Sequence, residues 1–201
     1  MINKFKKNSG ANMFVACLGK SSLKKNSSDY KTIRKLGKII IEENFGIIHG
    51  GYSGGAMQAI DEGASEAINE QGKKNSLNIG VPYSPFDNDW QRVEKSMFSK
   101  PAKKLSERID NIVCNSDIIV VLPKGGFGTL TELIYAFHMN QIEEDLNGKI
   151  RPIIFYGRNW KTLMKELMKG LDIKKQSAGK NWSYFVDTTE DFKKVLCSLQ
   201  K

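Results

Sequence analysis

The chain has 201 residues, of which 40% are hydrophobic and 26% charged, a balance typical of one globular domain with a substantial core. No apolar run reaches the roughly 20 residues of a membrane-spanning helix, and no signal-peptide segment follows the basic N-terminus, so we expect a cytoplasmic protein without membrane contact. The net charge of +9 favours anionic partners, such as small phosphates or nucleic acid. The lysines are spread as on a solvated surface, so charge alone does not decide the partner, and we do not expect nucleic acid.

Apolar runs alternate with segments of helical spacing along the chain. Residues 1–12 are expected to form a flexible leader, and residues 13–201 a single domain. We predict strands over 13–19, 45–51, 77–83, 117–126, 151–157 and 182–188. We predict helices over 29–44, 55–72, 102–116, 128–144, 159–171 and 189–200. The segment 84–100 shows no regular pattern.

This alternation predicts the fold class. The strands are continuous apolar runs, as expected when helices cover both faces of a sheet. The chain is therefore predicted to form an α/β, doubly wound parallel sheet of the modified Rossmann type. Ligands in such folds bind beyond the carboxyl ends of the strands.

Metal and disulfide sites are not indicated. The cysteines, Cys17, Cys114 and Cys197, are far apart and form no CxxC pair, and the only histidines are His49 and His138. We expect Cys17 and Cys114 to be small buried side chains.

Two glycine-rich turns lie at predicted strand ends, "HGGYSGGAMQA" at 49–59 and "PKGGFGTLTE" at 123–132. Each leads into a helix, whose first N–H groups can bind an anion while glycine allows close approach. Thr129 can cap the helix or donate to a phosphate oxygen. Neither turn matches GxGxxG or the Walker pattern, so a monophosphate is favoured over nicotinamide cofactors and nucleoside triphosphates. The alternative is that both are only tight strand-to-helix turns.

Glu132 lies about one turn into the second of these helices. Near a ribose it could bind hydroxyls, stabilise an oxocarbenium-like centre or activate water. Alternatively, it is an acid favoured by the helix dipole. The aromatic residues Tyr52, Tyr83, Phe127 and Trp90 could stack on a base but are assigned no role.

The sequence "GGFGTLTE" at 125–132 resembles the GGxGTxxE signature of the LONELY GUY-like phosphoribohydrolases. "GGYSGGAMQAIDEGA" at 50–64 and "LGKSS" at 18–22 resemble other parts of that family, and "GGYSGGAM" also resembles the related molybdenum-cofactor carrier proteins. The resemblance covers nearly the whole chain, from about residue 13 to 199.

The resemblance implies a homodimeric α/β enzyme without metal or organic cofactor. Such an enzyme cleaves a nucleoside 5′-monophosphate, of cytokinin riboside or AMP type, to free base and ribose 5-phosphate. It implies catalytic roles for Glu132 and for Arg108. Without the resemblance, Arg108 would be interpreted as a surface arginine paired with Glu107 or Asp110. We expect substrate and phosphate binding from Gly19, Ser21, Gly50, Gly51, Gly54, Gly55, Met57, Gly125, Gly126, Gly128 and Thr129.

Two positions depart from the family pattern. Lys124 is inserted before the glycines of the second turn, and Ile109 replaces the lysine that follows the family arginine. The alternative function is a non-catalytic protein on the same fold, which binds or carries a nucleotide or the molybdenum cofactor.

Overall fold

The computed structural model describes residues 1–172 and 182–200, and it contains a seven-stranded sheet. Residues 173–181 and 201 of the predicted domain lie outside the described part. The strands are β1 Phe14–Leu18, β2 Gly46–His49, β3 Asn78–Gly80, β4 Met97–Phe98, β5 Ile118–Val121, β6 Ile153–Tyr156 and β7 Ser183–Val186. The helices are α1 Ile2–Ser9, α2 Ser28–Glu42, α3 Gly55–Glu70, α4 Leu105–Val113, α5 Phe127–Asp145, α6 Arg158–Gly170 and α7 Thr189–Ser198.

All neighbouring strands pair in parallel, in the order β4-β3-β2-β1-β5-β6-β7. This arrangement confirms the predicted doubly wound α/β fold. The strand order reverses between β1 and β5, which pair with Leu18 opposite Val121. The chain therefore leaves both strands side by side, and a crevice opens there for a ligand.

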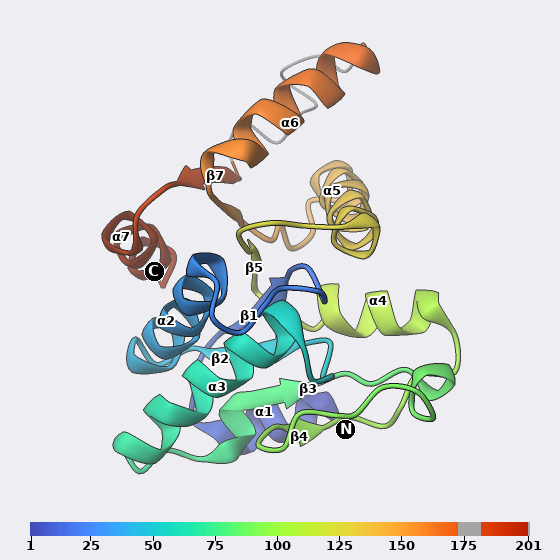
Figure 1. Cartoon of the computed structure of the whole chain (residues 1–201). Coiled ribbons are helices and arrows are strands. Elements are labelled where there is room, and N and C mark those ends of the chain that lie inside the picture. The colour runs from blue at the N-terminus through green and yellow to red at the C-terminus, as the bar shows by residue number, and fades with distance from the viewer. Residues whose placement is uncertain (173–181, 201) are drawn as a thin grey trace.

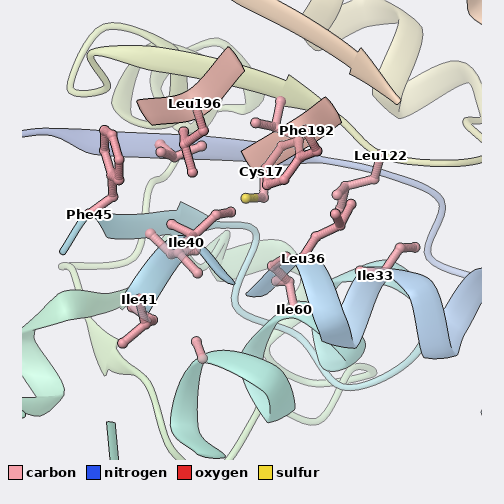
Figure 2. Packing of buried hydrophobic residues seen from close by; sticks show 14 of the residues in the cluster. Cys17, Ile33, Leu36, Ile40, Ile41, Phe45, Ile60, Leu122, Phe192 and Leu196 are labelled. Atoms are coloured by element: carbon pink, nitrogen blue, oxygen red, sulfur yellow. The ribbon is translucent and has the colours of Figure 1, made fainter. Parts of the chain in front are cut away.

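Helices cover both faces of the sheet (Figure 1). Residues of β1 alternate between two hydrophobic clusters: Val15 and Cys17 face α2, α3 and α7, whereas Phe14, Ala16 and Leu18 face the side of α1, α4, α5 and α6. Figure 2 shows the first cluster, in which side chains of α2 and α7 meet Cys17. The burial predicted for Cys17 is confirmed, while Cys114 is only partly buried.

The flexible leader predicted for residues 1–12 is wrong over residues 2–9, which form α1. Ile2 and Phe5 lie one turn apart and pack on the second cluster, so an apolar stripe anchors the helix. Lys6 Nζ lies 2.9 Å from the carbonyl oxygen of Asn115 and 3.4 Å from Asp117 Oδ2. The segment 84–100 also contains a short edge strand, β4, that was not predicted.

Among the described helices, none combines the length and the apolar character that a bilayer crossing requires.

Candidate functional site

A cleft of about 320 Å³ opens beyond the carboxyl ends of β1, β2 and β5, and we call it the central cleft. It lies at the reversal of strand order, where a ligand is expected. Its lining comprises Cys17, Gly19, Lys20, Ser21, Ser22, Gly50, Tyr52, Met57, Phe86, Trp90, Arg108, Ile112, Gly126, Phe127, Gly128, Thr129 and Glu132.

The central cleft brings together most of the residues predicted from the sequence. Those that line it are Gly19, Ser21, Gly50, Met57, Arg108, Gly126, Gly128, Thr129 and Glu132. Gly51, Gly54, Gly55 and Gly125 do not line it. Gly51 packs on Gly80, Gly55 on the backbone of Lys20 and Ser21, and Gly125 on the ring of Trp160. These glycines allow close packing of the turns outside the lining of the cleft.

Arg108 reaches the floor of the cleft from α4, and its side chain is only 9% exposed. Its Nε donates to the carbonyl oxygen of Val81 at 3.0 Å, and its Nη2 donates to that of Gly50 at 3.1 Å. A Cβ atom at Gly50 would lie 2.3 Å from Nη2, so only glycine leaves room for the guanidinium. Arg108 is therefore a buried cation and not the surface arginine of the alternative interpretation.

Glu132 projects from α5 toward Arg108, with 3.6 Å between Oε1 and Nη1. Its side chain is 14% exposed. Burial raises the pKa of the Glu132 carboxyl above its ordinary value, and the positive charge of Arg108 opposes this shift only in part. A carboxylate with a raised pKa is a stronger base than an ordinary glutamate, so it can accept a proton more readily.

Thr129 lies in the first turn of α5 and is 3% exposed. Its Oγ1 is buried and has no hydrogen-bond partner among the described residues. Buried hydroxyl groups are nearly always satisfied, so an unpartnered one in a cleft indicates a ligand atom. The N-cap residue of α5 is Gly126, which has no side chain to cap the first N–H groups. Thr129 and these N–H groups could together bind an anion, and we call them the anion site.

The two glycine turns, which look alike in the sequence, differ in the structure. At the start of α3, the N–H of Ala56 donates to the carbonyl oxygen of Lys20 at 2.8 Å. The N–H of Gly54 donates to Gln58 Oε1 at 3.0 Å. Residues of the chain thus occupy donors at the start of α3, whereas α5 presents its start to the cleft. The start of α5 is therefore more open to an anion than the start of α3.

Three aromatic residues, Tyr52, Phe86 and Trp90, also line the central cleft, and we call them the aromatic wall. Phe86 and Trp90 stack with 5.1 Å between ring centroids, and Tyr52 meets Trp90 edge-on at 5.9 Å. From the sequence, Tyr52 and Trp90 were assigned no role and Phe86 was not singled out. The feature of the sequence that could have indicated this wall is the pair Phe86 and Trp90 in the irregular segment that follows β3.

A buried polar network behind the cleft holds the turn at Gly51. The N–H of Gly51 donates to His49 Nδ1 at 3.2 Å, and His49 Nε2 lies 2.9 Å from Ser96 Oγ. Ser96 donates to Asp61 Oδ1 at 2.6 Å, and Asn78 donates to the same oxygen at 2.8 Å. Burial lowers the pKa of His49, which favours the neutral ring that this pattern needs. This network was not predicted from the sequence.

The two departures from the family pattern lie outside the central cleft. Ile109 is 7% exposed and packs in the second hydrophobic cluster. Lys124 adopts a left-handed conformation, with φ of 62°, and lines a neighbouring cavity. Lys20 and Arg108 are the cations that line the central cleft. No group of three or more His, Cys, Asp or Glu side chains in the described ranges could hold a metal ion.

The chain is similar to a known protein family. The model of the SLOG cluster4 family, a LONELY GUY-like family, matches residues 12–163, which confirms the resemblance inferred from the "GGFGTLTE" motif. No curated protein matches the chain.

Several solved structures share the fold. The molybdenum cofactor binding protein from the phototrophic bacterium Rippkaea orientalis is 21% identical, with a TM-score of 0.70 over 94% of this chain and 98% of that one. The molybdenum cofactor carrier protein of Chlamydomonas reinhardtii is 17% identical, with a TM-score of 0.63 over 93% and 97%. DNA processing protein A of Helicobacter pylori is 13% identical, with a TM-score of 0.57 over 97% and 83%. At these identities the likeness shows the fold alone.

The raised pKa of Glu132 leads to a prediction about stability. The folded state favours the protonated carboxyl, so Glu132 stabilises the fold most below the ordinary pKa of a glutamate. This contribution is lost as the pH rises through the raised folded-state pKa. We expect the free energy of unfolding of the wild type, relative to Glu132→Gln, to fall as the pH rises above about 4. Urea unfolding of both proteins at stepped pH measures this difference, and a difference that grows with pH would contradict the prediction.

Proposed function

The chain belongs to the SLOG cluster4 family, and we propose that it is a nucleoside 5′-monophosphate phosphoribohydrolase. The observation that carries this proposal is the buried pair of Glu132 and Arg108, with 3.6 Å between Oε1 and Nη1, on the floor of the central cleft. A buried carboxyl beside an anion site has a clear use when a sugar with developing positive charge lies between them.

The ligand is oriented by the two ends of the cleft. The 5′-phosphate binds at the start of α5, where it accepts hydrogen bonds from free N–H groups and from the Thr129 hydroxyl. Lys20 adds a positive charge on the same cleft. The base stacks on the wall of Tyr52, Phe86 and Trp90. This arrangement places the ribose over Glu132, so binding energy from both ends fixes the reacting bond.

The reaction consumes one water molecule. The bond between C1′ and the base nitrogen breaks, and the electron pair leaves with the base. The water oxygen forms the new bond to C1′. The Glu132 carboxylate takes one proton from this water and returns it to the departing base, which yields free base and ribose 5-phosphate. The carboxylate also stabilises the positive charge that develops at C1′.

Arg108 has a different role, because two backbone carbonyl groups and Glu132 already surround its guanidinium. It holds the Glu132 carboxylate in place and limits the rise of its pKa. Arg108 keeps enough of the carboxyl ionised to act on water.

A second candidate function is a carrier that binds its ligand without cleaving it. The similar structures named above favour this candidate, since proteins from two organisms are named for molybdenum cofactor binding or carriage. Ile109 favours it too, because the family lysine at this position is replaced by a core side chain. The same anion site would then hold a phosphate group of the cargo.

Substitution of the carboxyl distinguishes the two candidates. We expect the wild type to release free base and ribose 5-phosphate from at least one of AMP, GMP, CMP, UMP and an N6-substituted AMP. Glu132→Gln should lower the rate by at least about 100-fold, because the proton acceptor is lost. Chromatography measures both products, and calorimetry should show that the variant still binds the nucleotide. Undiminished turnover in Glu132→Gln would refute the proposed role, and binding without turnover in the wild type would indicate the carrier.

The anion site is tested by Thr129→Val, which replaces the hydroxyl by a methyl group of similar size. The free energy of unfolding should stay constant or rise by up to about 1 kcal/mol, since no hydrogen bond to a described residue is lost. Nucleoside monophosphate affinity should fall roughly ten- to hundredfold, as a hydrogen bond to a charged phosphate disappears. Thr131→Val is the matched control, because the Thr131 hydroxyl donates to the carbonyl oxygen of Phe127 at 2.8 Å. Equal affinities of Thr129→Val and wild type would contradict the site.

The protein is further proposed to form a homodimer through α5. Ile134 and Ile142 are exposed on this helix, and Leu146 is exposed at its C-cap. The three recur at intervals of four or eight residues, so they form one apolar stripe. Light scattering at micromolar concentration should give twice the chain mass, and Ile134→Lys should shift the protein toward the monomer. Leu171→Lys, at an exposed leucine that follows α6, should leave the dimer intact. A monomeric wild type would contradict this expectation.

A further inference from the structure

A second cavity of about 520 Å³ lies on the other side of the turn that precedes α5, and we call it the outer cavity. It opens beyond β6, between the starts of α2 and α6. Gly126 and Phe127 line both the outer cavity and the central cleft. Phe127, 91% exposed, stands on the ridge between them. The two hollows are therefore neighbours around one anion site.

The walls of the outer cavity are apolar and include two fixed aromatic rings. The indole Nε1 of Trp160 donates to the carbonyl oxygen of Leu122 at 3.0 Å, which sets the orientation of the ring. A Cβ atom at Gly125 would lie 2.6 Å from this ring, so the glycine lets the indole reach the turn. Tyr156 also lines the cavity and is buried, and Leu163 from α6 is 44% exposed. Such walls suit a flat ring system.

Polar side chains stand at the edge of this cavity. Asp29, Lys124 and Asn159 line it, and none makes a side-chain hydrogen bond or ion pair to another residue of the described ranges. A carboxylate and an amide can bind the hydroxyl groups of a sugar or the polar edge of a heterocycle. The occupant therefore combines an apolar ring with polar edges, as a nucleoside-like group does.

Positive charge is distributed over both hollows. Lys20 lines the central cleft, Lys124 lines the outer cavity, and the start of α5 lies between them. Lys124 holds the left-handed φ of 62°, a conformation that costs energy for a residue with a side chain. The N–H of Lys20 donates to the carbonyl oxygen of Lys124 at 3.3 Å, which ties the two lysine-bearing turns together. Two lysines around one helix start suit more negative charge than one monoester carries.

We propose that the outer cavity binds a second ring-bearing group, joined through phosphate to the nucleotide in the central cleft. The ligand is then a diphosphate-linked dinucleotide or a similar phosphate diester, and not only a nucleoside monophosphate. This inference rests on the proposed function for the position of the shared phosphate site. The glycosidic bond beside Glu132 remains the one that reacts.

Calorimetry with matched pairs of ligands tests the inference, in a Glu132→Gln background that prevents turnover. The probes are AMP, GMP, CMP and UMP, each with its symmetric dinucleoside 5′,5′-diphosphate. The diphosphate of the preferred base should bind about tenfold or more tightly than its monophosphate, since the second ring adds contacts at high effective concentration. Leu163→Trp, which fills the outer cavity, should remove this preference and change monophosphate affinity by less than about twofold.

Two further variants sharpen the result. Lys124→Gly removes a charge and relieves the left-handed strain, so it should weaken diphosphate binding without destabilising the fold. Leu171→Trp enlarges an exposed leucine outside the cavity and should preserve the preference. Monophosphate binding or cleavage without any diphosphate preference would overturn this inference and leave the proposed function standing, as would a preference that survives both Leu163→Trp and Lys124→Gly. Absence of binding by every probe would overturn both proposals.

Discussion

The buried guanidinium of Arg108 is the interaction on which the site depends, because it connects parts of the chain that are far apart in sequence. Its donors reach the carbonyl oxygens of Gly50 after β2 and Val81 after β3, and its third contact is Glu132 on α5. A buried cation is costly unless its hydrogen bonds are made, so these groups must stay in register. The His49 network serves the same end, since it holds the N–H of Gly51 next to the carbonyl that Arg108 uses.

Two effects in the central cleft act in opposite directions on the pKa of Glu132. Low exposure raises the pKa of its carboxyl, while Arg108 favours the ionised form, and the balance leaves the pKa raised. A carboxylate so close to an anion site would repel a phosphate that contacted it directly. In the proposed binding mode, the aromatic wall and the start of α5 resolve this conflict, because they would hold the two ends of the ligand apart and leave the sugar next to the carboxyl. The proposed function therefore requires the phosphate to stay away from Glu132.

Much of this arrangement could be predicted from the sequence, and the reasons for the failures are physical. The strand, glycine turn and helix over 117–144 form one local unit, so their pattern identified Thr129 and Glu132 as neighbours. Arg108 was identified only through the family resemblance. Its local neighbours Glu107 and Asp110 suggest a surface pair, whereas its actual partners lie 24 to 58 residues away. The aromatic wall comes from an irregular segment without periodicity, and the burial of α1 depends on a tertiary contact. The two glycine turns also look alike in the sequence. Only the packing shows that the carbonyl oxygen of Lys20 already accepts an N–H at the start of α3.

The inserted Lys124 and the substituted Ile109 have opposite consequences. Ile109 removes a charge from α4 and adds an apolar side chain to the core, so the floor of the central cleft depends on Arg108 for its cation. Lys124 adds a charge on the far side of the same turn, in a conformation that favours glycine. Together they remove a positive charge from α4 and add one in the outer cavity. The loss of the family lysine favours the carrier, whereas a hydrolase needs a buried carboxyl that can act as a base. A carrier has no comparable need for a buried carboxyl with a raised pKa, so Glu132 remains the feature that the hydrolase explains better.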